Sequence, residues 1–257
     1  MATPLVSCIL TCSSAVRVPL ARKAVNNFIR QRYLPYELFI VNSTGQSILT
    51  HDRLGSGCRI LEIPTHPGLN AASMRNTGLS VAQGDWVICI DDDDYFHPNR
   101  LLYQMAYRQK GRPCLLKYQL RMDVSQVINQ ATSDNPVYPG LHLLRRDEGI
   151  SSTALFPRID PETQAPWVFN PALNTGEYDE LLAQMKRQGS FPVVFDNKNT
   201  DLVPDQSLPL LSVAVYHGAN ELSPRQFFEH TEPDTGLNRY DMEHLKHVLQ
   251  LYDFQIK

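Results

Sequence analysis

Residues 88–98 read Ile-Cys-Ile-Asp-Asp-Asp-Asp-Tyr-Phe-His-Pro, a short apolar run followed by four consecutive carboxylates, Asp91 to Asp94. Two carboxylates ~4 Å apart repel by about 4 kcal/mol near a protein surface. A solvated tail tolerates such repulsion, but the end of a buried strand does not, so a positive group is expected beside the acids. Their oxygens suit a hard divalent cation. An acidic surface turn is the alternative that this stretch leaves open.

The composition is that of a globular protein, since 42% of the 257 residues are hydrophobic. The formal net charge of −3 shows no global basic bias of the kind that favours nucleic acid. The sequence has no apolar stretch near the roughly 18 residues of a membrane span and no secretory signal pattern. The five cysteines include no C-x-x-C pair, which argues against a disulfide framework or zinc site and for a reducing compartment. We therefore expect a cytoplasmic protein.

Strand and helix patterns alternate along the first hundred residues. Strands are predicted at 5–11, 37–41, 59–63 and 86–90, and helices at 19–32 and 70–82. This alternation predicts an α/β fold with a mostly parallel central sheet and helices on both faces. Ligands bind such sheets at the carboxyl ends of the strands, where Thr11, Asn42 and Asp91 fall.

The second half of the chain is less regular. Helices are predicted at 99–109, 175–189 and 241–252, and a strand at 212–216. Gly189 is a typical stop for the helix that precedes it. The stretch 123–150 is predicted to be an irregular connection.

Six segments form an ordered series of motifs. They are Val6-Ser7-Cys8-Ile9-Leu10-Thr11; Phe39-Ile40-Val41-Asn42-Ser43; Gly68, Arg75-Asn76 and Gly78 followed by Ala82-x-Gly84-Asp85-Trp86-Val87; Asp91 to Asp94 with Pro98; Gly176-Glu177; and Tyr216-His217-Gly218-x-Asn220-x-x-Ser223. The series resembles the family 2 glycosyltransferases of the GT-A fold over nearly the whole chain. Any one motif is weak, but six in order at suitable spacing are a specific signal.

The resemblance implies one α/β domain of GT-A type, a Rossmann-like sandwich. Residues 1–100 would form its nucleotide-sugar-binding half, and residues 101–257 its acceptor-binding half with a C-terminal helix. It also implies a metal-dependent inverting enzyme that moves a sugar from a nucleotide-sugar, by preference a UDP-sugar, to a hydroxyl acceptor.

A divalent ion, Mn²⁺ or Mg²⁺, is implied as the cofactor. It would bridge the donor phosphates and neutralise the charge that develops as the diphosphate leaves. By resemblance, Asp93 is the best metal ligand, Asp91 faces the ribose and the ion, and His217 adds a late ligand or a phosphate contact. Asp92 is assigned to donor binding. Asp92 and Asp94 are not both expected at the metal, because adjacent strand residues point to opposite sides.

Further donor contacts are implied near the ends of the first two strands. Thr11 and Ser13 stand where backbone and hydroxyl groups meet the nucleotide, with strand-end capping as their alternative role. Asn42, followed by Ser43, stands where the family usually has an Asp that reads the uracil edge, and its amide oxygen could still accept from the base. Arg75 is expected to approach the diphosphate or to pair with the acidic run.

An inverting displacement needs a general base to take the acceptor's proton. Counting back from Gly189 puts Tyr178 where the family's catalytic Asp lies, between Glu177 and Asp179. Residues two apart on a helix point to nearly opposite faces, so only one of these acids should reach the site. Glu177 is preferred because it matches the family's Glu, and Asp179 is second. Both acids would also stabilise the helix N-terminus, typically by about 0.3–1 kcal/mol.

Other functions compete with this hypothesis. An Asp-dependent phosphatase of the haloacid dehalogenase type needs Thr or Val where Tyr95 stands, and a calcium loop needs Gly where Phe96 stands. A catalytically inactive binder of nucleotide-sugars or glycans remains open because Gly-Glu-Tyr-Asp departs from the catalytic motif. The acceptor is also open among glycans, lipid-linked sugars, small molecules, proteins and hydroxymethylated DNA. Its contacts are expected within 110–170, including Trp167.

Overall fold

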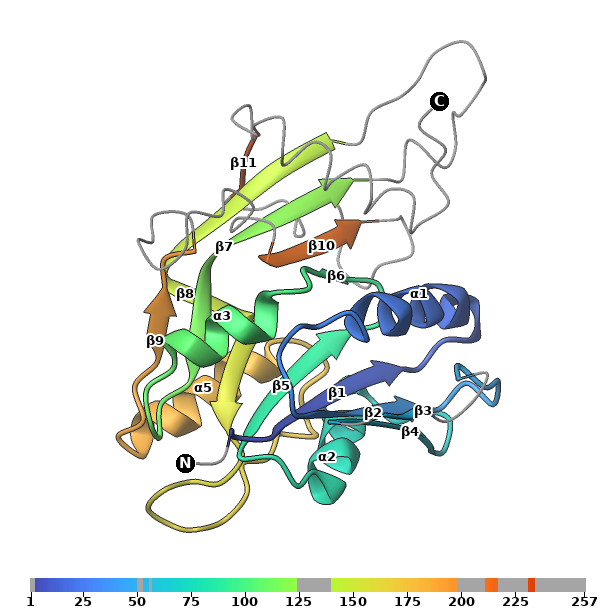
Figure 1. Cartoon of the computed structure of the whole chain (residues 1–257), viewed down its shortest axis with the longest axis horizontal. Coiled ribbons are helices and arrows are strands. Elements are labelled where there is room, and N and C mark those ends of the chain that lie inside the picture. Colours follow the sequence, from blue (N-terminus) through green and yellow to red (C-terminus); the bar gives the residue numbers. More distant parts are fainter. Residues whose placement is uncertain are drawn as a thin grey trace.

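A computed structural model describes residues 3–49, 53–55, 57–123, 140–197, 211–216 and 231–233. In these ranges one mixed sheet of eleven strands runs through the molecule, in the order β3-β4-β2-β1-β5-β8-β7-β10-β6, with β11 beside β8 and β9 beside β7 (Figure 1). The predicted helix at 241–252 and His217 lie outside the described residues. The α/β class predicted from the sequence is confirmed.

The first half of the chain builds the parallel part of the sheet. Its main strands are β1 (Val6–Cys12), β2 (Tyr36–Asn42), β4 (Cys58–Pro64) and β5 (Trp86–Asp91), and the short β3 (Arg53–Gly55) runs antiparallel to β4. The four predicted strands agree with these bounds to within one or two residues. Because β1 lies between β2 and β5, its carboxyl end adjoins the acidic run, and Thr11 is paired with Asp91.

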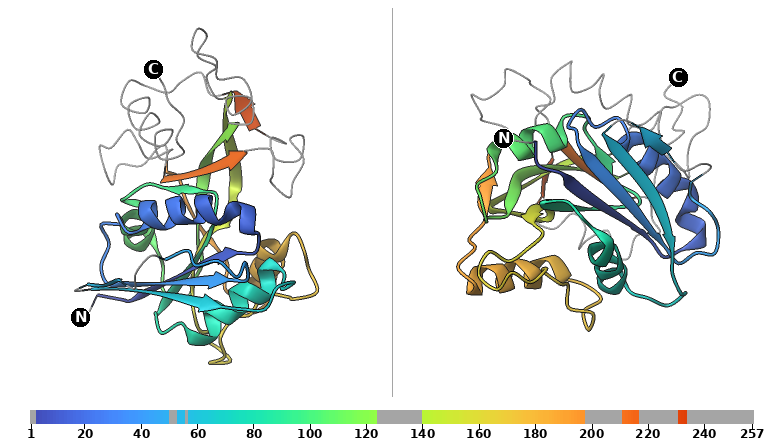
Figure 2. Two further views of the ribbon diagram at one scale, coloured as in Figure 1. Left: turned by 90° about the vertical axis from the view of Figure 1, so that its right-hand side faces the viewer. Right: turned by 60° about the horizontal axis from the view of Figure 1, so that its bottom comes forward.

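Helices cover both faces of this part of the sheet. One face holds α1 (Val18–Phe28), which follows the 3-10 turn η1 (Ala15–Arg17), and α3 (Arg100–Tyr107); the other holds α2 (Ala71–Val81) and α5 (Glu177–Arg187). Alternation in β1 explains the two layers, since Cys8 and Leu10 join the core with α1 and Ile9 joins the core with α2. The left view of Figure 2 shows α1 and α2 on opposite sides of the strands. None of the helices in the described ranges has the length and apolar content that crossing a membrane requires.

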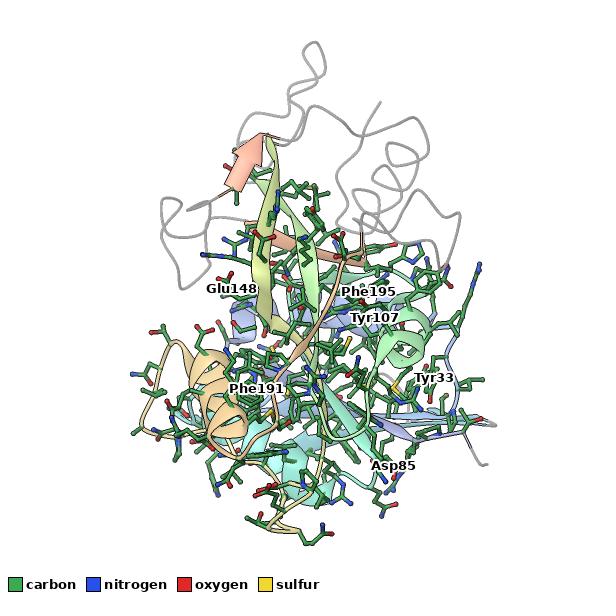
Figure 3. All side chains as sticks on the ribbon, turned by 90° about the vertical axis from the view of Figure 1, so that its left-hand side faces the viewer. Tyr33, Asp85, Tyr107, Glu148, Phe191 and Phe195 are labelled. Atoms are coloured by element: carbon green, nitrogen blue, oxygen red, sulfur yellow. The ribbon has the colours of Figure 1, made fainter. Side chains whose placement is uncertain are left out.

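The second half extends the sheet with mostly antiparallel neighbours. Its strands are β7 (Cys114–Asp123), β8 (Gly140–Pro157), β9 (Val193–Phe195), β10 (Ser212–Tyr216) and β11 (Thr231–Pro233). The short β6 (Tyr95–Phe96) of the first half pairs with β10. Strand β8 runs antiparallel to both β5 and β7 and so joins the two halves. Tyr107 of α3 stacks on Phe195 of β9 with ring centroids 4.7 Å apart, which fixes α3 against this region (Figure 3).

The prediction of an irregular connection at 123–150 is wrong for residues 140–150, which belong to β8. The charged residues Arg145 to Glu148 and then Gly149 interrupt any apolar alternation that would have marked a strand. The strand is instead stabilised by its neighbours, because Leu155 is paired with both Ile88 of β5 and Cys114 of β7.

Close packing accounts for two glycines of the motif series. A Cβ on Gly78 of α2 would lie 2.6 Å from Cγ2 of Ile9, and one on Gly84 would lie 2.6 Å from the backbone nitrogen of Ser7. The turn at Gly84 is further held by Glu37, whose Oε1 accepts hydrogen bonds from Ser7 Oγ at 2.6 Å and from Gly84 N at 3.2 Å. Helix α2 therefore packs directly against β1, and the turn before β5 lies close to the start of β1.

We predict that Gly78→Ala lowers the free energy of unfolding by about 1–3 kcal/mol, because the added methyl overpacks the α2–β1 contact. In an Ile9→Ala background the methyl has room, so the same change should cost less. Ser80→Ala, at an exposed position of the same helix, is the control and should stay within about 0.5 kcal/mol. Urea unfolding measures all four variants, and an equal cost of Gly78→Ala in both backgrounds would contradict the packing explanation.

Candidate active site

A cavity of about 290 Å³ opens at the carboxyl ends of β1 and β5. The first half of the chain lines it with Thr11, Ser13, Arg17, Ala71, Arg75 and Asp91 to Asp94, and the second half with Gln119, Arg121, Ser152, Asn174 to Tyr178 and Ala214. Seven side chains proposed from the sequence meet here: Thr11, Ser13, Arg75, Asp91, Asp92, Asp93 and Glu177. Residues far apart in the sequence therefore share one concave surface.

The acidic run bends away from the strand after its first residue. Strand β5 ends at Asp91, and the residues that follow form a turn, so the alternation of a strand does not govern Asp92 to Asp94. Asp92 and Asp93 are both buried and both contact Arg17. Asp94 accepts a hydrogen bond from the backbone N–H of Val215, and removal from water raises its pKa well above the ordinary value.

Arg17, from η1, supplies positive charge to the acidic turn. Its Nη2 contacts an oxygen of Asp92 and lies 2.6 Å from Oδ2 of Asp93. Burial raises the pKa of Asp92 to about 7, although Arg17 opposes the shift. The two carboxylates thus converge on a single nitrogen atom. In the described ranges, no three His, Cys, Asp or Glu side chains are grouped as metal ligands.

Arg75, from α2, joins the end of β5 to the start of α5. Its Nη2 lies 3.0 Å from Asp91 Oδ1, and its Nη1 donates to Glu177 Oε1. The guanidinium carbon lies 4.5 Å from the centre of the Tyr178 ring, and the side chain is 4% exposed. Burial lowers the pKa of Arg75, but the groups around it, Asp91 and Glu177 among them, outweigh burial and raise it. The pairing of Arg75 with the acidic run is therefore present.

The first turn of α5 separates the two candidate bases. Gly176 precedes the helix with a φ of 73°, in the left-handed region that favours glycine. Glu177 is buried and lines the cavity, whereas Asp179 is exposed and does not line it. Tyr178 points into the core, where its ring meets that of Phe169 edge-on at 5.4 Å. Of the two acids, only Glu177 faces the cavity.

Two side chains proposed for donor binding do not line this cavity. Asn42 donates to Gln46 O at 2.7 Å and to Glu62 Oε1 at 2.5 Å, and its Oδ1 accepts from Thr44 N at 2.9 Å. Ser43 is buried with its Oγ 3.9 Å from the sulfur of Met74. His217, proposed as a late metal ligand, lies outside the described residues.

Some lining residues were not proposed from the sequence. Arg17 could have been predicted from the sequence, because it follows β1, and the end of β1 adjoins the acidic run in a parallel sheet. Gln119 and Arg121 on β7 and Ser152 on β8 fall within the stretch 110–170 expected to hold the acceptor contacts, but no local pattern singles them out, since long-range pairing brings them to the cavity. Trp167, expected among the acceptor contacts, is instead buried in the core with α5.

We predict that Arg75→Met lowers the free energy of unfolding by about 3–5 kcal/mol, because it leaves the buried carboxylate of Glu177 without its counter-charge. Adding Glu177→Gln should recover part of the loss. Arg187→Met is the matched control, since Arg187 pairs with Glu180 on the surface with 62% of its side chain exposed, and it should cost less than about 1 kcal/mol. Urea unfolding measures the variants. Equal losses of unfolding free energy in Arg75→Met and Arg187→Met would show that the burial of the Arg75 ion pair does not determine the cost.

Comparison with known proteins identifies the family of the chain. Residues 9–148, more than half of the chain, match the family described as Glycosyl transferase family 2. An uncharacterized glycosyltransferase of Bacillus subtilis, YwdF, is 32% identical over 85 residues, which are 33% of this chain and 32% of that protein. A putative colanic acid biosynthesis glycosyl transferase of Escherichia coli, WcaA, is 32% identical over 97 residues, 37% of this chain and 35% of that protein. The chain thus spans about a third of each relative's length.

Solved structures share the fold. S. aureus TarS 1-349 in complex with UDP-GlcNAc has a TM-score of 0.53 at 14% identity and covers 88% of this chain and 64% of that one. The mannosyltransferase PcManGT from Pyrobaculum calidifontis, in complex with GDP-Man and Mn²⁺, has a TM-score of 0.52 at 14% identity and covers 98% of this chain and 64% of that one. These likenesses place the sheet and its helices in the GT-A fold. From the match over more than half of its length, the chain belongs to glycosyl transferase family 2.

Proposed function

We propose that this chain transfers a sugar from a nucleotide-sugar, by preference a UDP-sugar, to a hydroxyl group of an acceptor in the cytoplasm, with inversion and with a divalent ion. One observation carries the proposal: the acidic end of β5, the hydroxyl-bearing end of β1 and the first turn of α5 face the same cavity. Family membership leaves the phosphatase hypothesis without support.

The carboxylates fit a hard cation. Asp92 and Asp93 direct oxygens at one point that a guanidinium nitrogen holds, and Asp91 stands beside them. Asp93 and Asp91 are the proposed metal ligands, with Asp92 near the donor and His217 as a further candidate. A bound Mn²⁺ or Mg²⁺ supplies charge neutralisation for the departing diphosphate. Only a few side chains are proposed as metal ligands, because oxygens of the donor phosphates would complete the coordination shell of the ion.

The nucleotide is proposed to lie against the end of β1. Thr11 and Ser13 line the cavity there and offer hydroxyl groups to the donor. The preference for uridine rests on the sequence resemblance, and the hydrogen bonds of Asn42 to Glu62 and Thr44 leave that preference to experiment. One structural neighbour is in complex with UDP-GlcNAc and another with GDP-Man, so the test should include both uridine and guanosine donors.

Glu177 is the proposed general base. Its Oε1 accepts from Arg75, which fixes the orientation of the carboxylate and leaves Oε2 to take the proton of the acceptor hydroxyl. Gln119, Arg121 and Ser152, from strands β7 and β8, line the same cavity as Glu177. The acceptor, whether a glycan, lipid-linked sugar, small molecule or hydroxymethylated DNA, is proposed to lie against these strands.

We expect a thermal-shift panel of UDP-, GDP- and dTDP-sugars, each with and without Mn²⁺, to show stabilisation that requires both donor and metal. A ligand at about 100 times its Kd stabilises the fold by about 2.7 kcal/mol, an easily measured shift. The nucleotide whose sugar gives the largest increase in melting temperature identifies the donor. Absence of a response to every donor would overturn the proposal.

We predict that Glu177→Gln lowers turnover by about 10²–10⁴-fold while donor binding remains, because the variant cannot accept a proton. Asp179→Asn is the control and should keep its turnover, since Asp179 does not line the cavity. Sugar transfer to a panel of glycan acceptors gives the rates, and thermal unfolding checks the folds. Full activity of Glu177→Gln would refute the base assignment.

A native protein that binds the donor but transfers to no acceptor would instead be the inactive binder, for which the ion pair of Glu177 with Arg75 is the observation in favour.

A further inference from the structure

Two arginines pair with the acidic run, but only one is fixed by its surroundings. Arg75 bonds two carboxylates through different nitrogens and lies under the ring of Tyr178. Arg17 gives one nitrogen, Nη2, to both Asp92 and Asp93. Its buried Nε makes no hydrogen bond within the described part of the chain. Arg17 is therefore held through one nitrogen, whereas Arg75, whose Nε is also buried without a hydrogen bond among the described residues, is held through two nitrogens and by the ring of Tyr178.

The short turn that carries Arg17 lies at the surface between two buried residues, Cys12 and Val18. The turn η1 has three residues, none of them buried, and Ser14 before it makes no side-chain capping bond. The neighbouring side chain of Val16 is 78% exposed. A rotation of the Arg17 side chain would thus disturb no packing of the core.

Arg17 occupies the position that the proposed metal ion needs. Its Nη2 is 2.6 Å from Asp93 Oδ2 and also contacts Asp92. A divalent ion bound to Asp93, one of its two proposed ligands, cannot share that carboxylate with a guanidinium, because the two cations repel at such separations. The ion therefore displaces Arg17, which then needs another anion. The donor diphosphate would bring that anion into the same cavity.

We infer that Arg17 is a further donor-binding residue that exchanges partners: it neutralises Asp92 and Asp93 in the absence of donor and metal, and it binds the donor diphosphate once an ion takes Asp93 together with Asp91. This inference rests on the proposed function. Arg17 opposes the ion in the absence of donor and contacts the diphosphate in its presence. Metal and donor affinities are consequently coupled, and by linkage each raises the other by the same factor.

The test measures binding of Mn²⁺, with and without UDP, from the electron paramagnetic resonance signal of the free ion. In the native protein, UDP should tighten Mn²⁺ binding. In Arg17→Gln, Mn²⁺ alone should bind about tenfold tighter, within the usual range of coupling between sites, and UDP should add less. Arg17→Met, which keeps the apolar stem, repeats the test should the glutamine variant not fold.

Arg22→Gln is the matched control, because it removes the same charge from α1, where Arg22 donates to Ser47 O at 2.6 Å outside the cavity. It should leave both affinities unchanged. An unaltered Mn²⁺ affinity in the Arg17 variants, or equal tightening in Arg22→Gln, would overturn the inference while the metal site stands. If no variant binds Mn²⁺ with or without UDP, the proposed metal site fails and this inference fails with it.

Discussion

Charge compensation at the end of β5 is the constraint on which the candidate site depends. Arg17 reaches the acids from the loop after β1, and Arg75 reaches them from α2 on the other side of the sheet. Compensation is incomplete, because burial still raises the pKa of Asp92 to about 7 and that of Asp94 well above its ordinary value. A cluster in this condition favours an additional cation, which agrees with the chemistry proposed for the cavity.

Topology brings these charges together. Because β1 is paired with β5, the turn η1 that follows β1 lies beside the end of β5. The close contact of α2 with β1 at Gly78 fixes the distance of Arg75 from the sheet. Arg75 then meets Glu177 across 102 residues of sequence. Glu177 begins helix α5, and Tyr178 is the core residue nearest to it on that helix, so the residue that departs from the family motif also anchors the turn that carries the candidate base.

The sequence predicted the first half of the fold well because its signals are local. Apolar runs and helical spacing predicted the four main strands and the three helices up to α3 to within a few residues, whereas the short β3 and β6 were missed, and the acidic run marked the cavity. Strand β8 was missed because Arg145 to Glu148 resemble a loop in the sequence, and the strand is defined by its pairing with β7 and, at Leu155 to Pro157, with β5. Gln119, Arg121 and Ser152 were missed for the same reason. Arg17 could have been found from charge complementarity with the adjacent strand end.

Strand β8 also affects how the protein is made. The outer edge of β5 gains its neighbour only when Leu155 to Pro157 have been synthesised, long after Trp86 to Ile88. Until then, a growing chain carries an unpaired strand edge with apolar side chains, a surface that pairs readily with other chains. At ordinary translation rates this interval lasts on the order of 10 s. The strand that delivers the acids therefore exposes an edge that can pair with other chains during synthesis.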